Sequence, residues 1–337
     1  AYLFSRTLNS KNRALAHLGI IGAVGDIQDE NGFSNLNLEI LDDAVKAKKL
    51  EVIENGLNFF GKQTRPLFRI LQYTDNPYIP DVSGSMGGTI QFLKHVVGID
   101  DKKVERVKIR DLDKEQMERL RAGIIMKRAD QETPEDIFSN SYLLVDEKEG
   151  SPLKDVKEFS TLLNACGRLE RASLGIGVCL GNKKSKESAM KSMKNYRKEI
   201  AISLDWYHNN KGSGEVFSGE GFTIINAKDN ILASVAGTMA SILSKSNEFE
   251  EGHYILSMAQ MLDNNTKASI RVAGRNIDED VDLRVIIQKI SEKVDGEAGG
   301  HKHAAGALFA TELEDKFVDI AKSILAKHAI EEKLVEN

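Results

Sequence analysis

The feature that most constrains the fold is a stretch over residues 183–210, KKSKESAMKSMKNYRKEIAISLDWYHNN, which contains neither glycine nor proline. Because these two residues are the strongest helix breakers, the stretch predicts one continuous helix, about 40 Å long at a rise of 1.5 Å per residue. Its first half is rich in lysine, and its second half is apolar, with Ile200, Leu204 and Trp206. We therefore expect a connecting helix and hinge over residues 183–213 between two domains.

The sequence before this helix and the sequence after it have different patterns of apolar residues. Residues 1–182 carry apolar residues at helical spacing, and we expect helices near residues 14–24, 34–49, 65–73, 86–97, 113–129 and 153–166. Residues 214–337 alternate between short β-rich runs and helical segments, which is the pattern of an α/β domain. In this C-terminal part the expected strands are residues 215–217, 222–226, 254–261 and 268–273, and the expected helices are residues 234–244, 281–294 and 312–327.

Composition narrows the functional classes. The chain has 337 residues, 41% of them hydrophobic and 29% charged, so it is an ordinary globular chain and long disordered tracts are excluded. No apolar run approaches the roughly 18 residues of a membrane-spanning helix. Two cysteines exclude a disulfide framework and fit a cytoplasmic location. The net charge of −5 means that any nucleic-acid site is a local basic patch.

The motif with the clearest chemistry is GGHKHAAG, residues 299–306. Gly299 and Gly300 allow a backbone to approach a ligand closely, and His301 adds a donor. If a helix begins near His301, its free N–H groups would face that ligand and suit a phosphate. A glycine turn before a short helix, with exposed histidines, explains the motif equally well.

A second motif is Ser269-Ile270-Arg271, which we expect on a strand. Alternate residues of a strand point to the same face, so Ser269 and Arg271 lie together. A hydroxyl group beside a guanidinium group is a good clamp for phosphate. An exposed strand face without a ligand is the simpler explanation of these residues taken alone.

Two weaker candidates lie in the N-terminal half. Asp26 ends the apolar run GAVGD and could hold a divalent cation, although one carboxylate is not a metal site. A helix-terminal Asp in a turn is the commoner arrangement. Asn164 and Arg168, in NACGR, form a polar pair at a helix end and are compatible with simple capping.

Together these motifs resemble the DHH phosphoesterase superfamily. IIGAVGDIQD, LLNACGR, ASIR and GGHKHAAG occur in the order seen there, over essentially the whole chain. The match is similar to the RecJ-like single-strand exonucleases, and NFFGKQTRPLFRILQYTDNP looks like their archaeal branch. The resemblance implies an α/β fold with two domains: the C-terminal part of a DHH domain over residues 1–182, and a DHH-associated substrate-binding domain over residues 214–337.

The resemblance also implies roles for residues. Asp26 would be a catalytic residue and a ligand of one of two Mn²⁺ or Mg²⁺ ions that activate water for phosphodiester hydrolysis. The Asp-His-His motif of the family is absent, and we expect it in a longer protein, before Ala1. The resemblance also assigns phosphate binding to a larger set, in which His301 is catalytic as well: Asn164, Arg168, Ser269, Arg271, Gly299, Gly300 and His301.

The implied substrate is single-stranded DNA or RNA, in replication or repair. Two other functions stay open: a DHH enzyme acting on short oligonucleotides or cyclic dinucleotides, and a non-catalytic replisome component. The second would bind the GINS complex of the replicative helicase, as relatives of the archaeal branch do. Membrane partners are not expected.

Overall fold

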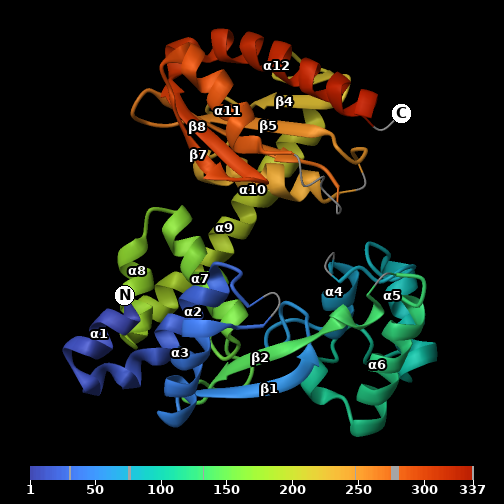
Figure 1. The fold of residues 1–337 in the computed structure, drawn as a ribbon. Helices are drawn as coiled ribbons and strands as arrows, with labels where there is room; N and C mark the ends of the chain where they lie inside the picture. The colour runs from blue at the N-terminus through green and yellow to red at the C-terminus, as the bar shows by residue number, and fades with distance from the viewer. Residues whose placement is uncertain (30–31, 75–76, 132, 247, 275–280, 336–337) are drawn as a thin grey trace. The chain divides into compact units, whose positions relative to one another are not determined.

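A computed structural model describes residues 1–29, 32–74, 77–131, 133–246, 248–274 and 281–335, with side chains up to residue 329. The chain forms two compact units (Figure 1). The first contains residues 1–167 and 171–189, and the second contains residues 168–170 and 190–337. The division falls within the long helix α9, Lys183–Asn209, so this helix contributes to both units.

The first unit is mainly helical. The long expected helices are present, and the N-cap of α6 is Asp113, whose side chain accepts a hydrogen bond from the backbone N–H of Gln116 at 2.8 Å. The α-helices of this unit before α9 are α1 Tyr2–Leu8, α2 Ala16–Gly25, α3 Asn35–Lys46, α4 Leu67–Gln72, α5 Met86–Phe92, α6 Lys114–Lys127, α7 Val156–Arg168 and α8 Ala172–Cys179. Shorter 3₁₀ or π turns cover Ser10–Leu15, Leu93–Val97, Ile109–Asp111 and Pro134–Ile137.

Two strands of the first unit are not among the expected elements. Strand β1, Leu50–Leu57, pairs antiparallel with β2, Phe138–Leu144. The pairing has an irregularity between Ile53 and Gly56, and Asn55 has a positive φ of 52°. Asn55-Gly56 is a typical turn pair, which hides the strand in the sequence. In the structure the strand continues through this pair as a bulge.

The second unit is built on a six-stranded sheet with the order β3-β4-β5-β6-β8-β7. Only the β4–β5 pair is parallel, among the pairs that the structure describes. The first four strands lie close to their expected positions: β3 Val216–Gly219, β4 Phe222–Asn226, β5 Tyr254–Gln260 and β6 Asn265–Val272. The last two, β7 Glu297–His301 and β8 Ala304–Ala310, are not among the expected strands.

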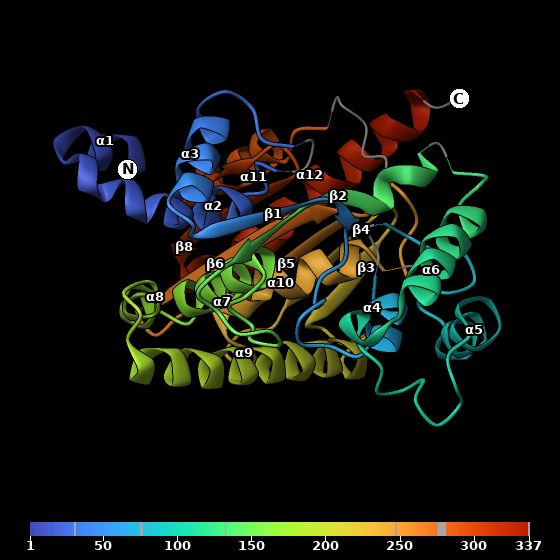
Figure 2. The ribbon, with the colours of Figure 1, turned by 90° about the horizontal axis from the view of Figure 1, so that it is seen from below.

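Helices cover the two faces of this sheet differently. Helices α11, Leu283–Ser291, and α12, Glu314–Val335, pack on one face, where Ile287 and Phe317 are fully buried. On the other face, α10, Ala233–Ser244, packs against β5 and β6 (Figure 2). The end of α9 joins α10 there, with Tyr207 in the same core cluster. Within the described ranges, every helix is too short or too polar to cross a membrane.

The expected helix start at His301 is wrong. Residues 297–310 form a β-hairpin in which His301 pairs with Ala304, so Lys302 and His303 make a two-residue turn. The alternation in β8 explains this, because Ala305, Ala307 and Phe309 point into the core and the residues between them do not. A period of two favours a strand over a helix. The motif therefore offers a ligand no helix N-terminus.

We predict that the end of α9 is needed to stabilise the second unit. Tyr207 is only 2% exposed and packs with Val216 and Ile225. A fragment of residues 214–337 lacks this aromatic ring, and should be less stable than a fragment of residues 190–337 by roughly 3–5 kcal/mol, the usual cost of removing a large core aromatic side chain. Urea denaturation followed by circular dichroism measures the difference. Equal midpoints for the two fragments would contradict this role for Tyr207.

Candidate functional site

The second unit contains a trough of about 710 Å³. It lies on the face of the sheet that α10 packs against, and it extends over β8 and β7, which follow β6 in the sheet. Its wall is α10, and its floor is made by β6, β8 and β7. The polar and glycine residues that line it are Arg168, Ser234, Gly237, Thr238, Ser241, Lys267, Ser269, Arg271, Glu297, Gly299, Gly300 and Gly306.

Strand register brings separate motifs of the sequence together in this trough. Ser269 of β6 pairs with Gly306 of β8, which pairs in turn with Gly299 of β7. Residues directly opposite each other in antiparallel strands share a face of the sheet. Ser269 therefore faces the trough together with two glycines that leave space above the sheet. Residues of the ASIR and GGHKHAAG motifs therefore form one continuous surface on the floor of the trough.

Ser269 is held at the back of this trough. It is only 6% exposed, and its hydroxyl group has no hydrogen-bond partner in the part of the chain that the structure describes. A Cβ atom at Gly237 of α10 would lie 2.9 Å from Ser269 Oγ, so only a glycine lets the helix approach this closely. The Ser269 oxygen is not among the fully buried side-chain atoms without a partner, so it opens on the trough and can donate to an anionic ligand oxygen there.

Arg271 lies two residues further along β6, on the same face. Its Nε donates to Ser241 Oγ at 2.9 Å, and one terminal nitrogen donates to the carbonyl oxygen of Ile270 at 2.7 Å. Among the residues that the structure describes, no carboxylate pairs with it. Burial, and then the nearby Arg168 guanidinium, lower the pKa of Arg271. Two like charges in one trough create a site for an anion.

Arg168 is positioned by hydroxyl groups of the second unit. One of its terminal nitrogens donates to Thr238 Oγ1 at 2.7 Å and to the Tyr196 hydroxyl at 3.0 Å. Simple capping of the helix end therefore does not account for Arg168, because these contacts orient its side chain at the trough. Lys267 adds a third cation to the lining, and Glu297 is the acidic residue among the lining residues.

The two glycines of the motif have different structural reasons. Gly300 has a φ of 136°, and a Cβ atom there would lie 2.5 Å from the Ala304 carbonyl oxygen, so the hairpin itself requires glycine. A Cβ atom at Gly299 would meet nothing within 4 Å. The fold therefore tolerates a side chain at Gly299, and glycine there keeps the trough open. His301 is exposed, and strand alternation places it on the face of Gly299.

The candidate residues of the first unit do not gather a metal site. Asp26 is exposed at the C-terminal end of α2 and accepts a hydrogen bond from Gln28 Nε2 at 2.8 Å. Asn164 of α7 lies beside this helix end, with its amide nitrogen 3.9 Å from the Cβ position of Gly25. The described residues contain no group of three or more His, Cys, Asp or Glu side chains that could hold a metal ion. Asp26 alone does not fit a Mn²⁺ or Mg²⁺ site.

Sequence patterns missed several residues of the trough. Lys267 carries the same signal as Ser269 and Arg271, because it precedes Ser269 by two residues on one strand. Thr238 and Ser241 sit on α10 and have no local signal, because only the packing of α10 on β6 brings them to the trough.

Two family models match the chain. Residues 59–139 match the DHH-CID domain, and residues 220–327 match the DHHA1 domain, which contains all of the trough except Arg168. The chain belongs to the DHH superfamily. The DHH resemblance and the mixed α/β fold expected from the motifs are confirmed.

The chain is also similar to a curated relative and to two solved structures. The uncharacterized protein MJ0831 of Methanocaldococcus jannaschii is 24% identical over 93% of this DHH chain, which spans 64% of the relative's length. CDC45 from Entamoeba histolytica has the same fold, with a TM-score of 0.54 and 7% identity over 91% of this chain and 67% of its own. RecJ from Thermus thermophilus, crystallised with Mn²⁺, matches 51% of this chain and 24% of its own at 15% identity, with a TM-score of 0.40.

We predict that the two glycines of the DHHA1 hairpin respond oppositely to alanine. Gly300→Ala should destabilise the protein by roughly 1–3 kcal/mol, because its backbone conformation disfavours a side chain. Gly299→Ala should leave the melting temperature unchanged or slightly raised, and should weaken binding of a labelled oligonucleotide because its methyl group enters the trough. Gly214→Ala, at an exposed position with open space around it, is the control. Unaltered binding by Gly299→Ala would show that this part of the trough holds no ligand.

Proposed function

We propose that this protein binds single-stranded nucleic acid through the trough of its DHHA1 domain and acts as a RecJ-like exonuclease on that strand. The observation that supports this most directly is the unpartnered Ser269 hydroxyl beside the Arg271 guanidinium, on one strand and facing one cavity. The membership in the DHH superfamily, whose fold is that of phosphoesterases, supports phosphodiester hydrolysis as the reaction class.

Each group in the trough has a role in this proposal. Arg271 donates to the oxygens of a backbone phosphate as a planar fork, and Ser269 donates its hydroxyl proton to the same phosphate. Arg168 and Lys267 neutralise the phosphates on either side of it. Gly299 and Gly300 let the sugar-phosphate chain lie close to the sheet. His301, at the exposed end of β7, contacts the phosphate next to the scissile bond.

Hydrolysis needs groups that the described residues do not bring together. A divalent cation would supply an activated water, and Asp26 is the candidate ligand. Since Asp26 has no second carboxylate or histidine in a group with it, we assign no step to a metal. Asn164, beside the same helix end, would orient the strand near Asp26.

The alternative role is a non-catalytic replisome protein that binds a partner such as the GINS complex. One observation favours it: Asp26 lacks further metal ligands among the described side chains, whereas the trough carries a full set of anion-binding groups. Strand binding without cleavage is the property that separates this role from that of the exonuclease. A phosphodiesterase of short oligonucleotides would differ from both, by losing activity as the substrate lengthens.

We predict that strand binding depends on Arg271 and requires no metal. In EDTA, Arg271→Ala should weaken binding of a fluorescent oligonucleotide by about 1.5–3 kcal/mol, the usual contribution of a hydrogen bond to a charged group. Arg271→Lys should recover only part of it, because a point charge replaces a fork. Lys245→Ala, which removes a cation outside the trough lining, is the control. Equal affinities of wild type and Arg271→Ala, or a strict requirement for metal, would contradict the trough as the phosphate site.

We predict that Asp26 separates cleavage from binding. If the protein is an exonuclease, Asp26→Ala should abolish Mn²⁺-dependent release of mononucleotides from a labelled strand and leave its affinity for the strand unaltered. Asp42→Ala, at an exposed aspartate of α3, is the control. Gel analysis of the products measures the rate. Full cleavage by Asp26→Ala would remove this residue from catalysis, and strand binding by a wild type that never cleaves would favour the non-catalytic role.

A further inference from the structure

The lysine-rich sequence of α9 continues into the second unit and is not part of the trough. Three lysines of this helix, Lys191, Lys194 and Lys198, are exposed and belong to the same unit as the trough, but they do not line it. We call them the lysine row. Lysines on a helix are ordinarily a solvated face, so what surrounds these three decides whether they bind something.

The buried side of α9 is used by the fold. Ser192, Met193 and Tyr196 are at most 8% exposed. The Tyr196 hydroxyl accepts a hydrogen bond from Arg168 at 3.0 Å and lies 2.7 Å from Thr238 Oγ1, so this side of the helix supports the trough. At 3.6 residues per turn, the lysine row lies on the opposite side of α9, which is seen along its length in Figure 2.

The three lysines lie next to one another on one face of the helix. Lys191 and Lys194 are three residues apart, and Lys194 and Lys198 are four residues apart. Residues at these spacings are neighbours on a helix surface, and like charges there destabilise the helix. Folding alone therefore does not favour this arrangement.

No acidic group compensates the lysine row in the part of the chain that the structure describes. None of the three lysines forms an ion pair or a side-chain hydrogen bond there. Other lysines of this region do, because Lys186 pairs with Glu147, and Lys211 pairs with Glu248 at 2.6 Å. The net charge of the chain is −5, so a general surplus of basic residues does not explain three uncompensated cations side by side.

The geometry of the row suits a linear polyanion. With a rise of 1.5 Å per residue, the three lysines are spaced by about 4.5 Å and about 6 Å along the axis. The row ends where Ile202 and Asp205 follow on the same face. A protein partner would need an apolar centre in its interface, whereas the row presents ammonium groups, which bind phosphate as point charges.

We propose that Lys191, Lys194 and Lys198 bind the phosphates of a nucleic-acid strand that extends beyond the trough. Nucleic acid as the ligand rests on the proposed function, but these residues are outside the site assigned there. An α-helix with its side chains is about 10–12 Å across, and the trough and the row are on opposite sides of α9. Only a long strand therefore reaches the row, and its occupation adds affinity that a short strand lacks.

The experiment measures the salt dependence of binding for two strand lengths. The probes are fluorescent oligothymidylates of about 4 and about 16 nucleotides, the limits of the site sizes common in single-strand binding domains. Each phosphate contact contributes about 0.7 to the slope of log affinity against log salt. The full chain with Lys191→Gln, Lys194→Gln and Lys198→Gln should lose about two units of slope with the long probe. Its binding of the short probe should be unaltered.

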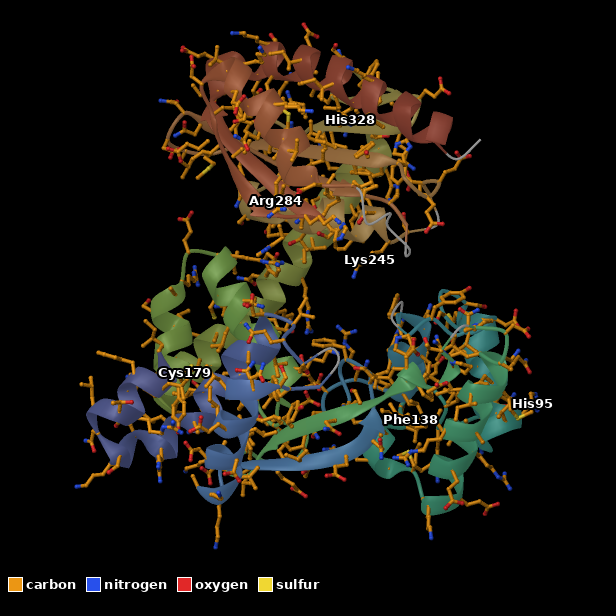
Figure 3. All side chains as sticks on the ribbon, viewed as in Figure 1. His95, Phe138, Cys179, Lys245, Arg284 and His328 are labelled. Carbon is orange, nitrogen blue, oxygen red and sulfur yellow. The ribbon has the colours of Figure 1, made fainter. Side chains whose placement is uncertain are left out.

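A second triple variant removes the same charge from the other face of the sheet. Lys289, Lys293 and Lys316 are exposed, and none of them forms an ion pair within the described ranges. They belong to or adjoin α11 and α12, the helices on which Figure 3 labels Arg284 and His328. Glutamine at these three positions should leave both slopes unaltered.

Two further measurements separate binding from folding. The triple glutamine variant of the lysine row should melt at the wild-type temperature or slightly above it, because glutamine is a good helix former and the repulsion is gone. Arginine at the same three positions should restore the slope with the long probe, because the contacts depend on charge.

Each outcome decides the matter. An unaltered slope with the long probe, an equal loss in the control variant, or an equal loss with the short probe would overturn the lysine row as a strand site. Equal displacement of the long probe by polyglutamate and by an unlabelled strand of the same charge would indicate acidic proteins instead.

Arg271→Ala distinguishes this proposal from the proposed function. If Arg271→Ala has no effect and the row variant still flattens the slope, the trough is wrong and the row stands. If only Arg271→Ala weakens binding, the row is wrong and the proposed function stands. A wild type that binds neither probe would contradict both.

Discussion

The pairing of β8 with both β6 and β7 is the constraint on which the candidate site depends. It aligns Ser269, Gly306 and Gly299 in one row across three strands, although these residues come from two distant motifs. A shift of β8 by one residue would turn Gly306 to the opposite face, toward α11 and α12, and would place an alanine opposite Ser269. The core residues Ala305, Ala307 and Phe309 prevent such a shift, because each would then leave the buried face. Hydrophobic burial on one face of the hairpin thus determines the chemistry on the other.

The electrostatics of the trough follow from how its cations are held. Arg271 is anchored by Ser241 and a backbone carbonyl, and Arg168 is anchored by Thr238 and Tyr196. These partners are neutral, so they orient the guanidinium groups without cancelling their charge. An arginine paired with a carboxylate would have little attraction left for a phosphate.

The proposed binding and the proposed hydrolysis would therefore depend on separate groups in this DHH protein. The anion-binding groups of the trough are complete within the second unit and contain no metal-ligand cluster. The candidate metal ligand, Asp26, stands at a helix end of the first unit without companion ligands among the described residues. Sites built from guanidinium, hydroxyl and backbone groups can act without an ion, whereas an isolated carboxylate cannot hold one. The proposed strand recognition rests on the first kind of site, and catalysis would need the second kind.

The sequence by itself determined the class of fold, most helices, the first four strands of the C-terminal sheet and the shared face of Ser269 and Arg271. These follow from local periodicity, which depends on neighbours a few residues apart. Only the tertiary structure decided that GGHKHAAG is a hairpin, that Asn55-Gly56 lies within a strand, and that Thr238 and Ser241 reach the trough. It also separated Gly300, which the backbone requires, from Gly299, which it does not. Long-range pairing sets these features, and nothing in the adjacent residues encodes which distant strand or helix will lie opposite.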